Sequence, residues 1–156
     1  MHFVEFMQTS GHQELAVWTD QDVGLTAFIA IHNTTLGPAL GGTRIWAHAT
    51  TDDAIMDVLR LSRAMTYKNA AAGLPVGGGK GLVLADPRKD KTEPMFRSYG
   101  RFVESYQGRY ITTEDVGASA RDMEWIAQET THVVGLPEER GGSGNPSTVT
   151  GFGVFQ

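Results

Sequence analysis

The chain of 156 residues contains no cysteine. Disulfide bonds and thiolate metal sites are therefore excluded, and nothing in the composition indicates an oxidising compartment. The sequence also has no apolar stretch near the roughly 20 residues of a membrane-spanning helix. The N-terminus lacks a basic start, and Glu5 interrupts what would have to be the apolar core of a secretory signal. We therefore expect a soluble, cytoplasmic protein.

Positive charge is scarce as well. The chain has 13 Lys and Arg residues against 18 Asp and Glu residues, which gives a formal net charge of -5. A mildly acidic surface argues against a nucleic-acid partner and against an anionic membrane. The five histidines show no metal-ligand spacing, so no metal site is predicted. What the chain does have is 40% hydrophobic residues, which suffices for one domain with its own core but not for two full domains.

Hydrophobic periodicity predicts a layered α/β domain, in which an all-strand beginning is followed by alternating helices and strands. The strands are expected at 14–33 (two, around a turn), 39–47, 81–87, 109–117 and 132–136, and the helices at 51–72, 93–108 and 119–130. Because the first two strands follow one another across a short turn, the sheet should be mixed and antiparallel near its start. Residues 137–151 are rich in Gly, Pro and Ser and are expected to form a loop or linker.

The stretch "VGGGKG" at 76–81 is the most unusual local feature. It fails the P-loop pattern at both its first and its last position, and it fails the dinucleotide pattern G-x-G-x-x-G at the last glycine. It also precedes a strand, whereas a phosphate loop follows a strand and opens a helix. One interpretation of Gly77, Gly78 and Gly79 is a tight connection with positive φ angles. Yet four glycines around one lysine exceed what a turn requires, and a phosphate-binding loop remains a third-ranked hypothesis.

Two lysines and one aspartate are the candidate chemical groups. Lys68 lies in the last turn of a long predicted helix, where any cation complements the helix dipole, but it also flanks the buried stripe. Lys80 directly precedes an apolar strand, and such surroundings disfavour its charged form. Asp115 lies at a strand exit, where a helix cap or a solvated acid is the simpler interpretation. Together, and near paired Gly41 and Gly42 that suggest close approach to the backbone, they could grip a carboxylate and move protons.

Four motifs, in this order, carry a family resemblance: "GPALGGTR", "MTYKNAAAGLPVGGGKG", "YITTEDVG" and "GGSGNPSTVTGFGV". The sequence resembles the glutamate/leucine/phenylalanine/valine dehydrogenases and looks most like the leucine and valine enzymes. The resemblance implies a three-layer α-β-α fold with a mixed, mostly parallel sheet. It also implies that residues 1–140 form a substrate-binding and oligomerisation domain. Residues 141–156 would be a linker and the start of a cofactor domain that is absent from this chain.

The same resemblance implies roles for individual residues. Lys68 and the backbone at Gly41 and Gly42 would hold the substrate carboxylate. Lys80 would activate the water that attacks the imine, and Asp115 would move protons to and from the amino group. The remaining implied contacts are Leu40, Met65 and Thr113 with the substrate, and Thr150 with the nicotinamide carboxamide of the cofactor.

Substrate choice follows from the position before the two glycines. Glutamate-specific members carry a basic residue there, whereas this chain has Leu40, which disfavours a second carboxylate because that group would be desolvated without a partner. Thr113 would narrow or polarise the same pocket. The expected function is thus the NAD(P)-dependent oxidative deamination of an apolar L-amino acid by a homo-oligomer, with NAD or NADP held mainly by a domain not present here. The alternative is a stand-alone, non-catalytic module for binding or oligomerisation.

Overall fold

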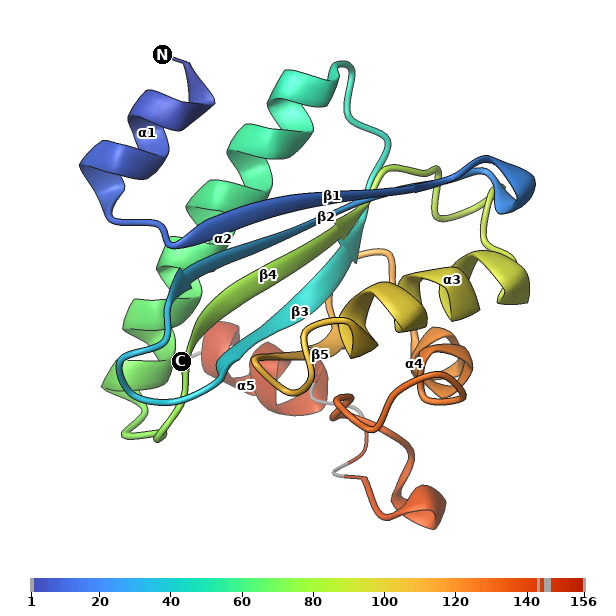
Figure 1. Cartoon of the computed structure of the whole chain (residues 1–156). Coiled ribbons are helices and arrows are strands. Elements are labelled where there is room, and N and C mark those ends of the chain that lie inside the picture. Colours follow the sequence, from blue (N-terminus) through green and yellow to red (C-terminus); the bar gives the residue numbers. More distant parts are fainter. Residues whose placement is uncertain (1, 143, 145–146, 156) are drawn as a thin grey trace.

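The computed structural model describes residues 2–142, 144 and 147–155, and it shows one sheet with helices on both faces (Figure 1). The strands are β1 (Glu14–Asp20), β2 (Leu25–Asn33), β3 (Ala39–Ile45), β4 (Gly77–Val83) and β5 (Tyr110–Glu114). The helices are α1 (Phe3–Ser10), α2 (Thr51–Ala71), α3 (Glu93–Glu104), α4 (Ala120–Ile126) and α5 (Ser147–Phe155), with 3-10 turns at Gln21–Val23 and Glu138–Arg140. The predicted three-layer α/β fold is confirmed.

The strands are ordered β1-β2-β4-β3-β5 across the sheet. β2 pairs antiparallel with β1 and with β4, whereas β3 pairs parallel with β4 and with β5. The sheet is therefore mixed and antiparallel near its start, as the sequence predicted. In the described residues its pairings divide equally between parallel and antiparallel, so it is not the mostly parallel sheet that the resemblance implied. Helix α2 is the crossover that joins the parallel neighbours β3 and β4, and it lies mainly on β2 and β4.

Each face of the sheet has its own core. One cluster of buried side chains lies between the sheet and helices α3 and α4, and the other lies between the sheet and helices α1 and α2. Strand β2 contributes alternately to both, since Phe28 and Ala30 belong to the α2 side and Ile29 and Ile31 to the opposite side. Burial on both faces explains why this strand is a continuous apolar run.

The long helix α2 begins and ends where its sequence predicts. The Thr50 hydroxyl accepts a hydrogen bond from the Asp53 amide at 3.1 Å, and two aspartates occupy the first turn. At the other end Gly73 has a φ of +67°, the left-handed conformation that closes many helices. Local sequence therefore determines both ends of this helix.

The predicted turn at Gly77–Gly79 is wrong, because these glycines are the first three residues of strand β4 and none has a positive φ. Their smallness serves close packing instead. A Cβ on Gly78 would overlap Thr66 of α2, and a Cβ on Gly79 would lie 2.8 Å from the Tyr110 ring. The glycines allow α2 on one face and an aromatic side chain on the other to reach the strand backbone.

Other expectations also differ from the structure. The predicted helices 93–108 and 119–130 end earlier, at Glu104 and Ile126. Residues 132–136 form only an isolated parallel bridge, Thr112 with Val133, rather than a strand. Helix α1 was not predicted; it is short and is held by packing of Phe3 and Phe6 on the α2-side core. Residues 147–155, within or just beyond the predicted linker, form α5, whereas 143, 145–146 and 156 lie outside the described residues. In the described part of the chain, no helix is long and apolar enough to cross a membrane.

Candidate active site

The candidate site lies on the face of the sheet that α2 only partly covers. Lys80 pairs in register with Ala30, which belongs to the α2-side core, so the lysine points to this face. Gly42 pairs with Thr113 on the neighbouring strand, beside Asp115. The predicted place of Asp115 at a strand exit is confirmed, but the other groups lie elsewhere along their strands. Asp115 does follow β5, but Lys80 and Gly42 lie in the middle of their strands, so the site is on the sheet face rather than at its edge.

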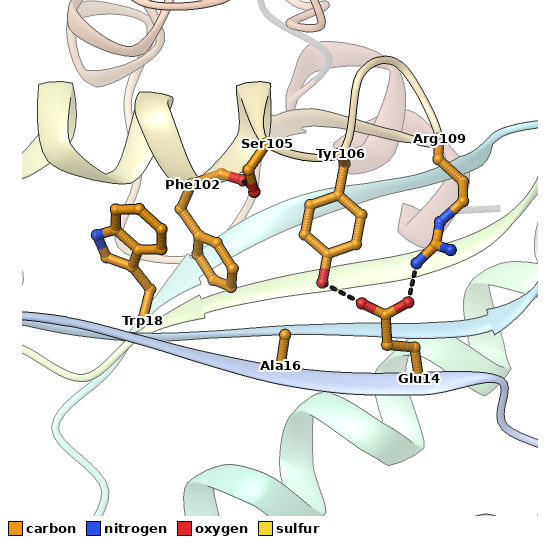
Figure 2. Close-up of a pocket in the computed structure, with 7 residues that line it drawn as sticks. All are labelled: Glu14, Ala16, Trp18, Phe102, Ser105, Tyr106 and Arg109. Carbon is orange, nitrogen blue, oxygen red and sulfur yellow. Dashed lines mark hydrogen bonds and ion pairs between the residues drawn. The ribbon is translucent and has the colours of Figure 1, made fainter.

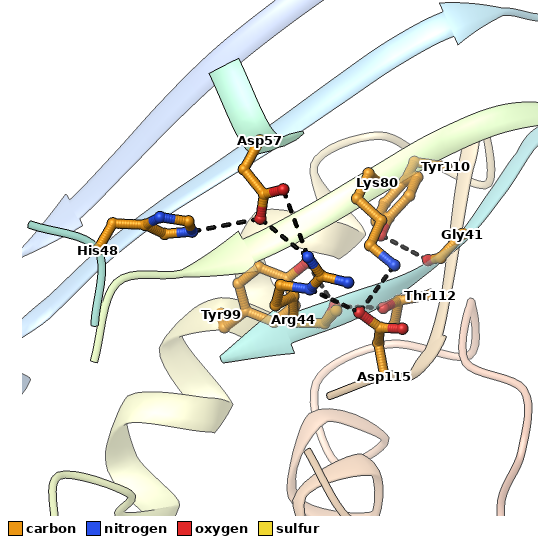
Figure 3. Close-up of polar contacts among 10 residues, drawn as sticks. Gly41, Arg44, His48, Asp57, Lys80, Tyr99, Tyr110, Thr112 and Asp115 are labelled. Atoms are coloured by element: carbon orange, nitrogen blue, oxygen red, sulfur yellow. Dashed lines mark hydrogen bonds and ion pairs between the residues drawn. The ribbon is translucent and has the colours of Figure 1, made fainter. Parts of the chain in front are cut away.

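Lys80 is a buried ammonium with a carboxylate partner. Its side chain is 4% exposed, and Nζ lies 2.9 Å from Oδ2 of Asp115 (Figure 3). Burial lowers the pKa of Lys80 below its usual range, and the attraction of Asp115 opposes that shift without cancelling it. The sequence prediction of a depressed lysine pKa opposed by the aspartate is therefore supported in direction.

Asp115 remains an ionised acid. Burial alone would raise the pKa of its carboxyl group, but the charges and hydrogen bonds of Lys80 and Arg44 outweigh burial and lower it. Both cations bind the same oxygen, Oδ2. Among the residues that the structure describes, the other oxygen, Oδ1, accepts no hydrogen bond. One oxygen of the carboxylate is thus left for a ligand on the open face.

Three residues of this charge network were not predicted from the sequence. Arg44 Nε donates to Asp115 Oδ2 at 3.1 Å, and its Nη1 donates to Asp57 at 3.0 and 3.3 Å. His48 Nε2 lies 3.2 Å from Asp57 Oδ2 (Figure 3). Arg44 could have been anticipated, because in a strand the residue two after Gly42 points to the same face. Asp57 carried no such indication, since it sits on a helix thirteen residues away.

The paired glycines 41 and 42 do mark a close approach to the backbone, as predicted. A Cβ on Gly41 would overlap the carbonyl of Gly79, and a Cβ on Gly42 would lie 2.9 Å from Cβ of Asp115. The groups that approach are the neighbouring strand and the candidate proton carrier. Glycine at these positions thus lets Asp115 stand directly beside the strand.

Lys68 is exposed, which corrects the expectation that it lies in inward-facing surroundings. It projects from the last turns of α2, whose C-terminal end is fixed by buried Asn69. The amide of Asn69 donates to the carbonyls of Gly77 at 2.6 Å and of Leu40 at 3.3 Å. This contact ties the end of the helix carrying Lys68 and half-buried Met65 to strands β3 and β4. Thr150, predicted to contact the cofactor, is exposed on α5.

Behind the site lies a buried network of hydroxyl groups. The Thr43 hydroxyl donates to Tyr99 Oη at 2.8 Å and lies 2.6 Å from the hydroxyl of Thr112, while Tyr110 Oη donates to the carbonyl of Gly41 at 2.7 Å. The Tyr110 contact with the Gly41 carbonyl is visible in Figure 3. A fully hydrogen-bonded buried network of this kind rigidifies its surroundings. It therefore fixes the backbone on which the candidate site is built.

A separate hollow of about 540 Å³ lies beside edge strand β1 (Figure 2). Trp18 and Phe102 line one part of it, and at the other end Glu14 accepts a hydrogen bond from Tyr106 Oη at 2.9 Å and pairs with Arg109. None of the predicted site residues borders this hollow. Within the described ranges, no group of three or more His, Cys, Asp or Glu residues is arranged to hold a metal ion.

The geometry defines an α/β domain in which a buried lysine pairs with a half-buried aspartate on a partly open face of the sheet. Residues 12–132 match the family described as "Glu/Leu/Phe/Val dehydrogenase, dimerisation domain". The chain belongs to this family. It is 53% identical to a leucine dehydrogenase of Geobacillus stearothermophilus over 156 residues, which are all of this chain and 42% of that protein. It is 50% identical to a phenylalanine dehydrogenase of Caldalkalibacillus thermarum, again over all of this chain and 42% of the relative.

A solved structure has the same fold. The crystal structure of L-tryptophan dehydrogenase from Nostoc punctiforme superimposes with a TM-score of 0.81 at 46% identity, over 84% of this chain and 39% of that one. The chain thus spans about two fifths of the length of the relatives that it matches. Since those relatives are amino-acid dehydrogenases, the family resemblance drawn from the four motifs is confirmed.

Proposed function

We propose that this chain is the substrate-binding and oligomerisation domain of an amino-acid dehydrogenase that oxidatively deaminates an apolar L-amino acid to its 2-oxo acid and ammonia. The observation that carries the proposal is the pairing of buried Lys80 with half-buried Asp115, 2.9 Å apart, in a chain of this family. A buried amine with a lowered pKa and a carboxylate with one oxygen that accepts no hydrogen bond from the described residues are the two groups that such proton transfers require.

Each of these residues has its own role in substrate binding or proton transfer. Lys68 and the backbone at Gly41 and Gly42 hold the carboxylate of the amino acid. Asp115 accepts a proton from the substrate amino group through its unpaired oxygen. Neutral Lys80 takes a proton from the water that adds to the carbon of the substrate imine. The carbinolamine formed in this way breaks down and releases ammonia and the 2-oxo acid. Residues 1–140 supply all these groups, and 141–156 lead toward the part of the enzyme that binds the cofactor.

A nicotinamide cofactor is implied by the dehydrogenase family. When bound, it supplies the chemistry of accepting a hydride from the substrate α-carbon. This chain has no glycine fingerprint for a dinucleotide, so we propose that NAD or NADP is held mainly by residues outside it. Thr150, exposed on α5, is the residue proposed to reach the nicotinamide carboxamide.

The side-chain pocket is proposed to favour leucine and valine over phenylalanine, and all three over glutamate. Leu40 and Thr113 lie on adjacent strands, with Leu40 opposite Ile111, and both are half-buried. A second substrate carboxylate placed there would lose its hydration without gaining a cation. Met65, on α2, is the proposed apolar contact from the helix.

The first test is a panel of L-amino acids offered to the complete gene product with NAD and, separately, NADP, with cofactor reduction followed by absorbance. We expect kcat/KM to be highest for leucine or valine and lowest for glutamate. If no amino acid supports cofactor reduction, the dehydrogenase assignment is wrong. The alternative, a non-catalytic binding or assembly module, then takes its place.

For the oligomer, we propose that edge strand β1 contacts a second copy of this chain. Among the described residues β1 pairs only with β2, so its other edge is open, and Val17 in its middle is 55% exposed. The hollow bounded by Trp18 and Phe102 opens beside this strand (Figure 2). The family description as a dimerisation domain supports self-association of the chain, and the open edge of β1 is the surface proposed for it.

Val17→Lys should weaken this association, because a lysine on an edge strand opposes strand pairing and burial. Analytical ultracentrifugation of the complete gene product is expected to show a shift toward smaller species at a given concentration. Leu36→Lys, which places the same charge on a residue that is 51% exposed in a turn, is the matched control. An unchanged sedimentation profile for Val17→Lys would place the interface elsewhere.

A further inference from the structure

The charge network around Asp115 has an uneven arrangement that the proposed roles of Lys80 and Asp115 do not explain. Lys80 Nζ and Arg44 Nε lie 2.9 and 3.1 Å from the same oxygen, Oδ2, although a carboxylate has two oxygens to offer. The other end of Arg44 is held by both oxygens of Asp57, at 3.0 and 3.3 Å. Arg44 is thus fixed at both ends, between an acid on α2 and the candidate proton carrier.

We propose that Arg44 is a positioning residue for the dehydrogenase reaction. It holds Asp115 by Oδ2 so that Oδ1 faces the substrate amino group, and it remains as the counter-charge of Asp115 when Lys80 gives up its proton. This inference rests on the proposed function, and it assigns Arg44 and its anchor Asp57 to the same site.

The role of Arg44 as counter-charge of Asp115 follows from the charges in the network. Lys80 and Arg44 face Asp115 and Asp57, so two cations balance two anions when Lys80 is protonated. When Lys80 is neutral, Asp115 would be a half-buried carboxylate without a partner if Arg44 were absent, and burying an unpaired charge is costly. A guanidinium does not deprotonate in proteins, so Arg44 supplies a permanent partner. The neutral state of Lys80 is therefore less costly in its presence.

The surroundings of Lys80 support this account. The charged groups that act on it are Asp115 after β5, Arg44 on β3 and Asp57 on α2, and its register partner on β2 is the apolar Ala30. Burial is the main cause that lowers the pKa of Lys80; the two acids raise that pKa, and Arg44 lowers it. His48 contacts Asp57 from behind, 3.2 Å away, and so belongs to the anchor of Arg44 rather than to Lys80.

The sign of the expected pH effect follows. Lys80 acts as a base only when neutral, so kcat/KM for oxidative deamination should rise with pH through the pKa of Lys80. Removing Arg44 removes a cation that repels protonated Lys80. It also leaves Lys80 as the one of these two cations that still pairs with Asp115, and both changes raise the pKa of Lys80. The rising limb of the pH profile should therefore move to higher pH in Arg44→Gln, by about one unit or more.

The experiment compares pH profiles of kcat/KM for wild-type protein, Arg44→Gln and Arg44→Lys, in the complete gene product and with its best substrate from the amino-acid panel. If the pKa of Lys80 rises by one unit in Arg44→Gln, the ratio of wild-type to variant kcat/KM should be about tenfold larger one pH unit below the wild-type pKa than on the alkaline plateau. Arg44→Lys, which keeps a cation, should restore most of the limb position. Arg88→Gln, which removes an exposed arginine after β4, should leave the profile unchanged.

Each of the following outcomes would overturn the inference. If Arg44→Gln lowers activity equally at every pH, Arg44 has only a structural role; thermal unfolding shows whether the variant is folded. If Arg44→Gln does not fold, Arg44→Met replaces it as the test, because it also removes the cation, and an unmoved limb there counts against the proposal. A wild-type protein inactive with every amino acid removes the proposed function, and this inference with it. An active wild type with an unmoved limb removes only the inference.

Discussion

Lys80→Ala in the complete gene product should lower kcat by roughly 10²–10⁴-fold, the range typical for loss of a general acid–base group. The structure gives the reason, because Lys80 is the buried amine of the site and has a lowered pKa. Its removal leaves Asp115 paired with Arg44, so the neighbouring carboxylate stays ionised and the fold does not gain an unpaired charge. The loss should therefore fall on turnover, measured by steady-state kinetics, and not on unfolding temperature.

Lys68→Ala is expected to behave differently. Lys68 is exposed and is proposed to act as a fixed charge for the substrate carboxylate, so its loss should raise KM for the amino acid more than it lowers kcat. Lys89→Ala, which removes a lysine with 78% exposure on a loop, serves as the control and should match wild type. Near-normal turnover of Lys80→Ala would contradict the assigned roles, even if the amino-acid panel had shown dehydrogenase activity.

Gly78→Ala should destabilise the fold by about 1–3 kcal/mol, the usual cost of forcing a methyl group into a filled core. The new Cβ would overlap the backbone and the hydroxyl of Thr66 and lie 2.5 Å from its Cα. A helix backbone cannot rotate aside as a flexible side chain can, so α2 has to move away from β4. That movement would also displace Lys68 and Met65, which lie near the same end of α2.

Two measurements follow for Gly78→Ala. Urea unfolding should show a lower midpoint, and steady-state kinetics should show a raised KM for the amino acid. Gly151→Ala is the matched control, since a Cβ there meets no atom within 4 Å and the residue lies in helix α5. If Gly78→Ala keeps the wild-type midpoint, the glycine is not needed for close packing of α2 against the strand.

Particular elements show where sequence patterns are sufficient. The apolar stripe of α2, the Thr50 cap and the glycine at its end predicted this helix within about one residue. The mismatch of residues 76–81 with both phosphate-binding patterns was informative too, because the glycines and Lys80 lie in strand β4 and not in a phosphate loop. Four ordered motifs indicated the family that residues 12–132 match. The helix signals and the 76–81 pattern are local, and the family signal comes from sequence similarity. Neither kind of signal requires knowledge of how distant segments pack.

Other features were decided only when the chain folded. Glycine prefers turns in isolation, but at positions 77–79 the approach of α2 and of Tyr110 to β4 makes it necessary in a strand. No pattern in the sequence connects Asp57 with Arg44. Their contact arises because the α2 crossover returns the helix over the sheet face on which Arg44 points.

The sequence by itself thus determined the α/β class, the ends of helix α2 and the candidate groups Lys80 and Asp115. The tertiary structure decided their electrostatic state. The pKa of Lys80 is lowered mainly by burial against Ala30 and α2. The pKa of Asp115 is lowered because Lys80 and Arg44 both bind one of its carboxylate oxygens. Burial and charge pairing depend on residues far apart in the chain, and for that reason no local pattern contains them.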